Sequence, residues 1–157
     1  NKVQCWLPDL KYADSSAAAR YSDAPDYFEE ATAAIEQMFR QTGPYEIDSS
    51  GILRKGVLIR HLILPGKVEN TKKVLEYVAD TFAPGEVLFS LMRQYVPCGR
   101  AAEYPEINRP ITDEEYEECE SYMEELGIVD GYVQQKASSD KMFIPAFDGT
   151  GVLKREE

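Results

Sequence analysis

The chain has 157 residues, of which 43% are hydrophobic, and its 17 Lys and Arg against 28 Asp and Glu give a formal charge of −11. This length is typical of one domain with a core large enough to fold. The acidic balance argues against non-specific binding to nucleic acid or to an anionic membrane, because both need clusters of Lys and Arg. No window reaches the ~20 apolar residues of a membrane-spanning helix, and no secretory signal is visible at the start.

The cysteines predict neither a disulfide framework nor a CxxC pair, because Cys5, Cys98 and Cys119 are odd in number and widely spaced. An acidic chain with this cysteine usage is typical of the cytoplasm. The first residue is Asn1, and a strand-like segment begins almost at once. A natural N-terminus rarely begins inside a buried element, so we expect a single domain over 1–157 that is cut from a longer protein.

The first half of the chain predicts two strands, a helix and a hairpin. The expected elements are a strand at 3–10, turns at 14–16 and 23–25, a helix at 26–42, a hairpin of 45–47 with 52–54, and a strand at 57–64. The helix has apolar residues at 3.6 spacing and stops at Gly43. The strand at 57–64 is apolar except for Arg60 and His61, which is typical of a parallel strand covered on both faces.

The second half predicts two more helices and two more strands. They are a helix at 69–82, a strand at 87–92, a loop at 93–111, a helix from Thr112 to about 126, a strand at 131–134 and a C-terminal tail at 136–157. The spacing of Thr112 and Glu115 fits a capping box. The loop at 93–111 contains three prolines, and loops of that length are usually binding or lid segments.

Strands that alternate with helices predict an α/β fold with a parallel sheet and right-handed crossovers. Four strands and three helices are too few for an eight-stranded barrel of ~250 residues. Two possibilities remain open, a small open sheet and part of a barrel whose other strands are missing. In the second case an exposed sheet edge could pair two copies into a dimer.

Charged and polar residues at the carboxyl ends of the strands are the candidate site, because parallel α/β folds bind ligands there. They are Asp9, Lys11, Arg60, His61, Ser90, Arg93, Gln94, Tyr95, Gln134 and Gln135. Asp9 and Lys11 are two residues apart and point to the same side of an extended chain. They could hold a small polar ligand, or form an ion pair with each other or with Arg60. The guanidinium of Arg60 suits a carboxylate, in a salt bridge or in a ligand clamp.

Other polar residues favour structural roles. His61 is the one histidine, and a lone histidine beside an arginine is more often a packed core residue than a general base. The acidic run 113–118 is typical of a solvated helix face, whose negative charges interact favourably with the N-terminal end of the helix dipole, rather than of a metal site. Nucleotide-binding glycine motifs, HExxH and GxSxG are absent. The residues alone therefore predict an α/β ligand-binding unit with charged strand ends.

Two segments resemble the radical S-adenosylmethionine (SAM) enzymes of the pyruvate formate-lyase-activating type. Residues 7–14 (LPDLKYAD) look like the D-x-K strand-end motif of that family, and residues 59–66 (IRHLILPG) resemble its strand written I-R-x-x-x-x-P-G. Residues 90–95 with 104–109 look like a subgroup of activating-enzyme-like iron–sulfur proteins. Residues 131–134 and 143–145 fit the end of that subgroup, so the resemblance extends over essentially the whole chain.

The resemblance implies the later β/α units of a partial (β/α)6 TIM-like barrel. In the family, a [4Fe–4S] cluster cleaves SAM reductively and a hydrogen atom is then abstracted. The best-known members take it from a glycine of a partner, a glycyl radical enzyme. The family's SAM-contacting Asp and Lys correspond to Asp9 and Lys11, and its strand arginine corresponds to Arg60. Gln94 lies where the next strand would reach the same pocket.

The chain departs from the family because it has no CxxxCxxC loop and no glycine-rich segment for the SAM amino group. Its widely spaced cysteines cannot ligate a cluster. We therefore expect this part alone to hold no metal and to be inactive, while a full-length parent is an active oxidoreductase. Two alternatives stay open: a non-catalytic α/β module that binds a small anion or a protein loop, and a flavodoxin-like domain that binds flavin.

Overall fold

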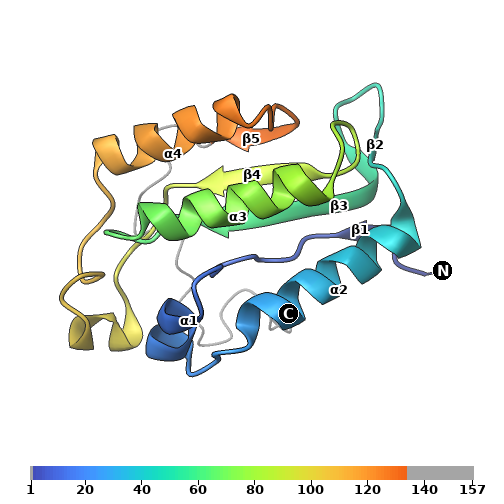
Figure 1. Ribbon diagram of the computed structural model, residues 1–157. Coiled ribbons are helices and arrows are strands. Elements are labelled where there is room, and N and C mark those ends of the chain that lie inside the picture. The colour runs from blue at the N-terminus through green and yellow to red at the C-terminus, as the bar shows by residue number, and fades with distance from the viewer. Residues whose placement is uncertain (1, 134–157) are drawn as a thin grey trace, which may run out of the picture.

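The computed structural model describes residues 2–133, which form a mixed α/β fold with a five-stranded sheet and four α-helices (Figure 1). The elements are β1 (Cys5–Trp6), α1 (Ser15–Ser22), α2 (Tyr27–Thr42), β2 (Glu46–Ile47), β3 (Leu53–Leu62), α3 (Val68–Thr81), β4 (Leu88–Met92), the 3-10 helix η1 (Gly99–Glu103), α4 (Asp113–Glu125) and β5 (Gly131–Val133). The expected order of strands and helices is confirmed, with one additional helix, α1. The sheet therefore has the α/β character that the alternating pattern predicts.

The strands β1, β3, β4 and β5 lie in chain order and run parallel, while β2 pairs antiparallel with the start of β3. The antiparallel pairing confirms the expected hairpin around residues 48–51. It also explains why β3 begins at Leu53, four residues earlier than expected. At Gly56 the backbone passes so close to Tyr45 that an added Cβ would lie 2.6 Å from the Tyr45 Cα.

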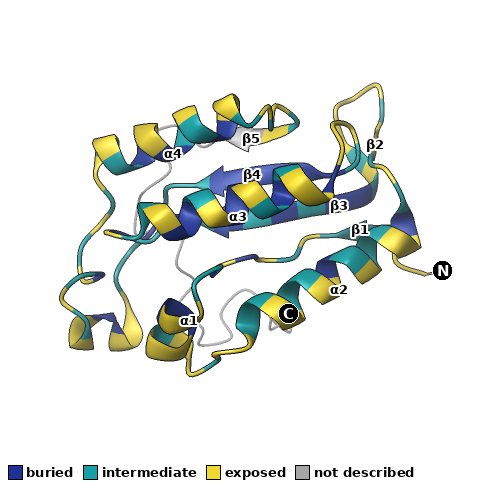
Figure 2. Ribbon diagram, in the orientation of Figure 1, coloured by how far each residue is buried: buried dark blue, intermediate teal, exposed yellow. Residues whose placement is uncertain are grey.

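One face of the sheet carries the hydrophobic core. Along β3, Val57, Ile59 and His61 are buried, whereas the residues between them are half-buried. The buried side chains pack in one cluster with residues of α2, α3 and α4. Figure 2 shows the same helices with their buried sides toward the sheet and their exposed sides outward. The three helices that connect the parallel strands therefore cover the same face (Figure 1).

Helix α1 corrects the expectation of a turn at residues 14–16. Asp14 is instead the N-cap of this helix, and its Oδ1 accepts hydrogen bonds from the Ser16 amide and hydroxyl. The same residue types favour turns and helix N-caps, because a short polar side chain can bond to the backbone in both. The expected capping box of Thr112 and Glu115 is confirmed at the start of α4.

The first strand is shorter than the expected 3–10. Only Cys5–Trp6 pairs with β3 as a ladder, and an isolated bridge joins Asp9 to Arg60 farther along. Pro8 has no amide hydrogen to donate, although its carbonyl accepts from the Arg60 amide at 2.9 Å. The tail at 136–157 lies outside the described residues. Within residues 2–133, no helix is long and apolar enough to cross a membrane.

Candidate functional site

Three polar residues lie side by side across neighbouring parallel strands. The bridge pairs Asp9 with Arg60, and the β3–β4 register pairs Arg60 with Ser90. Paired residues of adjacent strands face the same side of a sheet, and this side is opposite to the helices, since the neighbouring Ile59 and His61 face the core. The Nη2 atom of Arg60 lies 2.7 Å from Asp9 Oδ1. The row therefore holds an ion pair on the face that the helices do not cover.

This ion pair is half-open to solvent and incompletely satisfied. The side chains of Arg60 and Asp9 are 40% and 38% exposed. The Nε atom of Arg60 is nevertheless buried and has no hydrogen-bond partner among the described residues. Buried polar groups of proteins are nearly always hydrogen-bonded, so an unused donor calls for an acceptor. Because both side chains are partly exposed, the open side of the pair can receive a further oxygen ligand without loss of the Asp9–Arg60 contact.

The segment after β1 that carries Asp9 and Lys11 is held by two side chains that the sequence analysis missed. The Tyr27 hydroxyl donates to the Asp9 carbonyl at 2.8 Å and accepts from the Lys11 amide at 3.0 Å. Buried Asn70 donates from Nδ2 to the Lys11 carbonyl at 3.0 Å. Its Oδ1 accepts from the amides of two further residues, at 2.8 and 3.0 Å: Ala13 and Asp14. A polar residue among the inward positions of an amphipathic helix could have signalled Asn70, whereas Tyr27 gave no signal.

His61 is a third side chain that fixes the segment after β1. It is fully buried, and burial lowers its pKa to about 4, so the ring is neutral. Its Nδ1 therefore donates to the Leu10 carbonyl at 2.6 Å, and its Nε2 accepts from the Thr71 hydroxyl at 2.9 Å. The expectation of a packed, hydrogen-bonded core histidine is confirmed. No solvent-facing edge is left for general base catalysis.

The other predicted strand-end residues lie at the same edge of the sheet. Lys11 is exposed, and its ammonium forms no ion pair within residues 2–133. Gln94 is half-buried two residues past β4, with its Nε2 4.0 Å from the Met92 sulfur. The structure thus brings Asp9 and Arg60 into contact and places Lys11 and Gln94 after β1 and β4, the two strands on either side of β3. Gln134 and Gln135 lie outside the described residues.

The acidic residues at the start of α4 have structural roles. Arg93 lies 2.6 Å from an Asp113 oxygen, and the guanidinium of Arg109 contacts both carboxylate oxygens of Glu115 at 2.7 and 2.8 Å. Glu115 also accepts from the Gly66 amide at 2.6 Å, and these hydrogen bonds lower its pKa to about 2. Among the described residues, no group of three or more His, Cys, Asp or Glu side chains could hold a metal ion.

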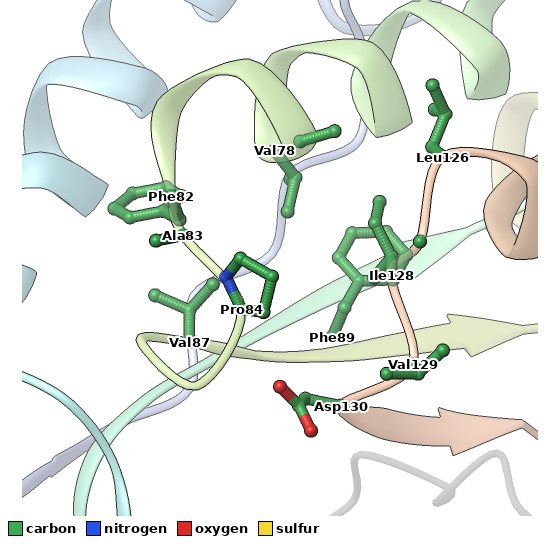
Figure 3. Close-up of a pocket in the computed structure, with 12 residues that line it drawn as sticks. Val78, Phe82, Ala83, Pro84, Val87, Phe89, Leu126, Ile128, Val129 and Asp130 are labelled. Carbon is green, nitrogen blue, oxygen red and sulfur yellow. The ribbon is translucent and has the colours of Figure 1, made fainter.

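A small apolar pocket lies at the opposite edge of the sheet, where β4 and β5 begin (Figure 3). Val78 of α3 and Phe82, just after this helix, meet Ile128 and Val129 of the loop before β5 across the pocket. Asp130 anchors this loop, because its Oδ2 accepts from the Gly85 amide at 2.8 Å. Open parallel α/β sheets bind ligands beyond the carboxyl ends of their strands, so we assign this pocket no role in the candidate site.

Comparison with known proteins finds similarity to an archaeal protein. Over 120 residues the chain is 28% identical to an uncharacterized protein of Methanocaldococcus jannaschii. The match covers 74% of this chain but 30% of that protein, so the chain spans less than a third of this relative's length. No protein-family model and no solved structure matches the chain. This relative is itself uncharacterized, so the similarity does not indicate an activity for the chain.

Proposed function

We propose that the chain is the C-terminal part of a radical SAM iron–sulfur enzyme resembling the pyruvate formate-lyase-activating type. In this proposal the chain supplies the later β/α units of a partial barrel, and its uncovered sheet face binds SAM. The observation that carries the proposal is the half-open ion pair of Asp9 and Arg60 on that face. The resemblance of residues 7–14 and 59–66 to the family motifs places the same two residues at the cofactor.

The arrangement of the sheet supports a barrel segment. Strands added in chain order with all connecting helices on one face build a β/α barrel. A doubly wound sheet instead carries helices on both faces and reverses its strand order at the ligand crevice. The parallel strands here follow chain order, and α2, α3 and α4 pack against one face. This favours the barrel over the flavodoxin-like alternative.

The residues present fit SAM. The side chain of Arg60 is 40% exposed, so its solvent-facing N–H groups could donate to a carboxylate or ribose hydroxyl of SAM. Asp9 could accept from a hydroxyl or ammonium group, and exposed Lys11 stands two residues away. When bound beside a reduced cluster, SAM supplies the reductive cleavage that leads to hydrogen-atom abstraction. The role of this chain is to bind and orient that cofactor.

The cysteines of the chain do not fit an iron–sulfur cluster. Cys119 is buried and Cys98 exposed, while the half-buried Cys5 directs its Sγ to the Leu53 carbonyl at 3.7 Å. Closely grouped thiolates are needed for ligation. We therefore propose that the cluster belongs to another part of the parent protein, and we expect this chain alone to be inactive. A glycyl radical enzyme as the partner is proposed from the resemblance alone.

Arg60→Ala in the longer parent protein tests the assignment. Removing a hydrogen bond to a charged group costs ~1.5–3 kcal/mol, so we expect SAM to bind about tenfold more weakly or worse by calorimetry. Arg54→Ala is the matched control, because Arg54 lies at the opposite end of the same strand, where it pairs with Asp48. Equal SAM affinity of the two variants would contradict the proposed site.

The gene sequence before Asn1 is an independent test. A CxxxCxxC motif within ~100 residues upstream, the distance covered by the missing β/α units of a barrel of this type, supports the enzyme. A natural start at Asn1 favours the non-catalytic module, in which the same charges hold a small anion or a protein loop.

A further inference from the structure

A second hollow lies beyond the carboxyl ends of the strands, between α1 and the loop at 93–112. Figure 1 shows these two segments side by side, past the arrowheads of β3 and β4. The hollow has a volume of about 210 Å³. Its lining is mainly aromatic and aliphatic: Tyr12, Tyr21, Tyr95, Tyr104, Leu64 and Ile107. A concave site with apolar walls and a few polar groups is the usual form of a small-molecule site.

The arginines around the hollow are already paired with carboxylates of the chain. Arg20 lies 2.7 Å from Glu106 and stacks over the ring of Tyr104, with 5.0 Å between its Cζ and the ring centre. The Lys67 ammonium lies 5.7 Å from the centre of the Tyr21 ring. Cations of the chain itself therefore lie over the rings of Tyr21 and Tyr104. The two arginines beside the hollow are balanced by carboxylates, Arg20 by Glu106 and Arg100 by Glu103. A neutral ligand fits these walls better than a cation or an anion.

Among the lining tyrosines, Tyr95 has a hydroxyl without any hydrogen-bond partner among the described residues. The hydroxyl of Tyr12 bonds to Ser22, that of Tyr21 donates to Glu106, and that of Tyr104 accepts from Arg100: 2.9, 2.9 and 3.3 Å, respectively. Tyr95 is only 9% exposed, and its hydroxyl has no hydrogen-bond partner within residues 2–133. Burial raises the pKa of Tyr95, so its phenol is a neutral donor.

We propose that this hollow binds an uncharged aromatic ring that carries one hydrogen-bonding substituent, with Tyr95 as its hydrogen-bond donor. The surrounding tyrosine rings can pack edge-to-face against the ligand ring. The proposal needs neither SAM nor a cluster, and it stands or falls separately from the proposed function. Phenol chemistry is shared by free small molecules and by tyrosine side chains, so the experiment includes both.

Cys98 provides the readout, because it lines the hollow and is exposed. Cys119 is buried, and burial raises its pKa to about 12, so this thiol is inert. In a Cys5→Ser background, the reaction of Cys98 with a disulfide reagent reports occupancy of the hollow. We expect p-cresol at about ten times its dissociation constant to slow the reaction about tenfold. Benzylamine and benzoate at the same concentration should leave the rate unchanged.

Tyr95→Phe tests the hydrogen bond without disturbing the packing, because the ring stays and the lost hydroxyl has no described partner. We expect p-cresol to bind about threefold to tenfold more weakly, the range for one neutral hydrogen bond, with an unchanged melting temperature. Tyr45→Phe, outside the hollow, is the matched control.

Comparing p-cresol with N-acetyltyrosinamide distinguishes the two possible sources of the ligand ring, a free small molecule and a tyrosine side chain. Protection of Cys98 by both supports a hollow that admits a tyrosine on a polypeptide. Protection by p-cresol alone supports a small-molecule site. The proposal is overturned by the absence of protection by p-cresol, by equal protection from the charged compounds, or by identical p-cresol affinity of the Tyr95→Phe variant.

Discussion

The two segments that follow β1 and β4 reach the same edge of the sheet but are held in opposite ways. Residues 9–14 are held by neutral hydrogen bonds from Tyr27, His61 and Asn70. The loop at 93–112 is held by ion pairs, from Glu106 to Arg20 and from Glu115 to Arg109. Neutral hydrogen bonds respond little to salt, whereas the Arg20–Glu106 ion pair, with side chains 52% and 36% exposed, is screened. The segment that carries Asp9 is thus the rigid side of the site.

This difference matters for binding because a preorganised group loses little entropy when its ligand arrives. The carbonyls of Asp9, Leu10 and Lys11 each have a side-chain partner. Asp9 therefore meets Arg60 from a fixed backbone. The loop at 93–112 borders the tyrosine-lined hollow and can adjust when its surface ion pairs loosen.

The largest expected effect comes from Asn70→Ala. The change removes three hydrogen bonds and leaves backbone groups of Lys11, Ala13 and Asp14 without partners. Leaving such buried or half-buried groups unsatisfied costs about 3 kcal/mol of unfolding free energy, which urea denaturation can measure. Asn108→Ala, at an exposed loop position, should cost almost nothing. Equal losses in the two variants would show that Asn70 does not hold the segment.

The next largest effect is a pH dependence of the unfolding free energy that is caused by His61. Its pKa is lowered from 6.5 to about 4 in the folded chain, so the unfolded chain binds the proton more readily. Stability is therefore fully present above pH ~6.5 and falls as the pH decreases toward 4. Between pH 6.5 and 5 we expect a loss of about 1.5 kcal/mol by urea denaturation.

This pH window isolates the histidine, because the chain has one histidine and the carboxylates titrate mainly below it. His61→Asn keeps a donor for the Leu10 carbonyl and removes the titrating ring. The variant should be less stable at pH 7, but its stability should change little from pH 6.5 to 5. If the unfolding free energy of the variant changed with pH as steeply as that of the unmodified chain, His61 would be ruled out as the source of the pH dependence.

A smaller effect is expected for Glu115→Gln. Glu115 completes the capping box with Thr112, pairs with Arg109 and accepts from Gly66. Its side chain is only 15% exposed. Losing the charge weakens these bonds together, and we expect a destabilisation of about 1 kcal/mol. Glu117→Gln on the exposed side of α4 serves as the control in the same thermal or urea unfolding measurement, and it should be neutral.

The sequence predicted the elements with strong periodicity and missed those that depend on one polar contact. The helices α2, α3 and α4 and the strand β4 follow from apolar spacing and from end signals such as Gly43 and Thr112. Helix α1 was missed because Asp14 suits a turn as well as an N-cap. At the site, spacing left Asp9 with two possible partners, and only the strand register selects Arg60. The hydrogen bonds of Tyr27 and Asn70 join residues 16 or more positions apart, which no local pattern reveals.

The smallest effect, and the sharpest test of the contrast between the two segments, is expected for Glu106→Gln. Glu106 accepts from Arg20 and Tyr21, and these hydrogen bonds lower its pKa to about 2, so the carboxylate is charged at neutral pH. Because the pair is exposed, global stability should not change measurably. The local effect should appear as faster amide hydrogen exchange in the loop at 93–112. Salt at about 1 M, where the screening length is about 3 Å, should speed exchange in the unmodified loop toward that of the variant. Residues 9–14 should exchange at the same rate in both conditions, and an equal response of the two segments would mean that charge pairs hold both.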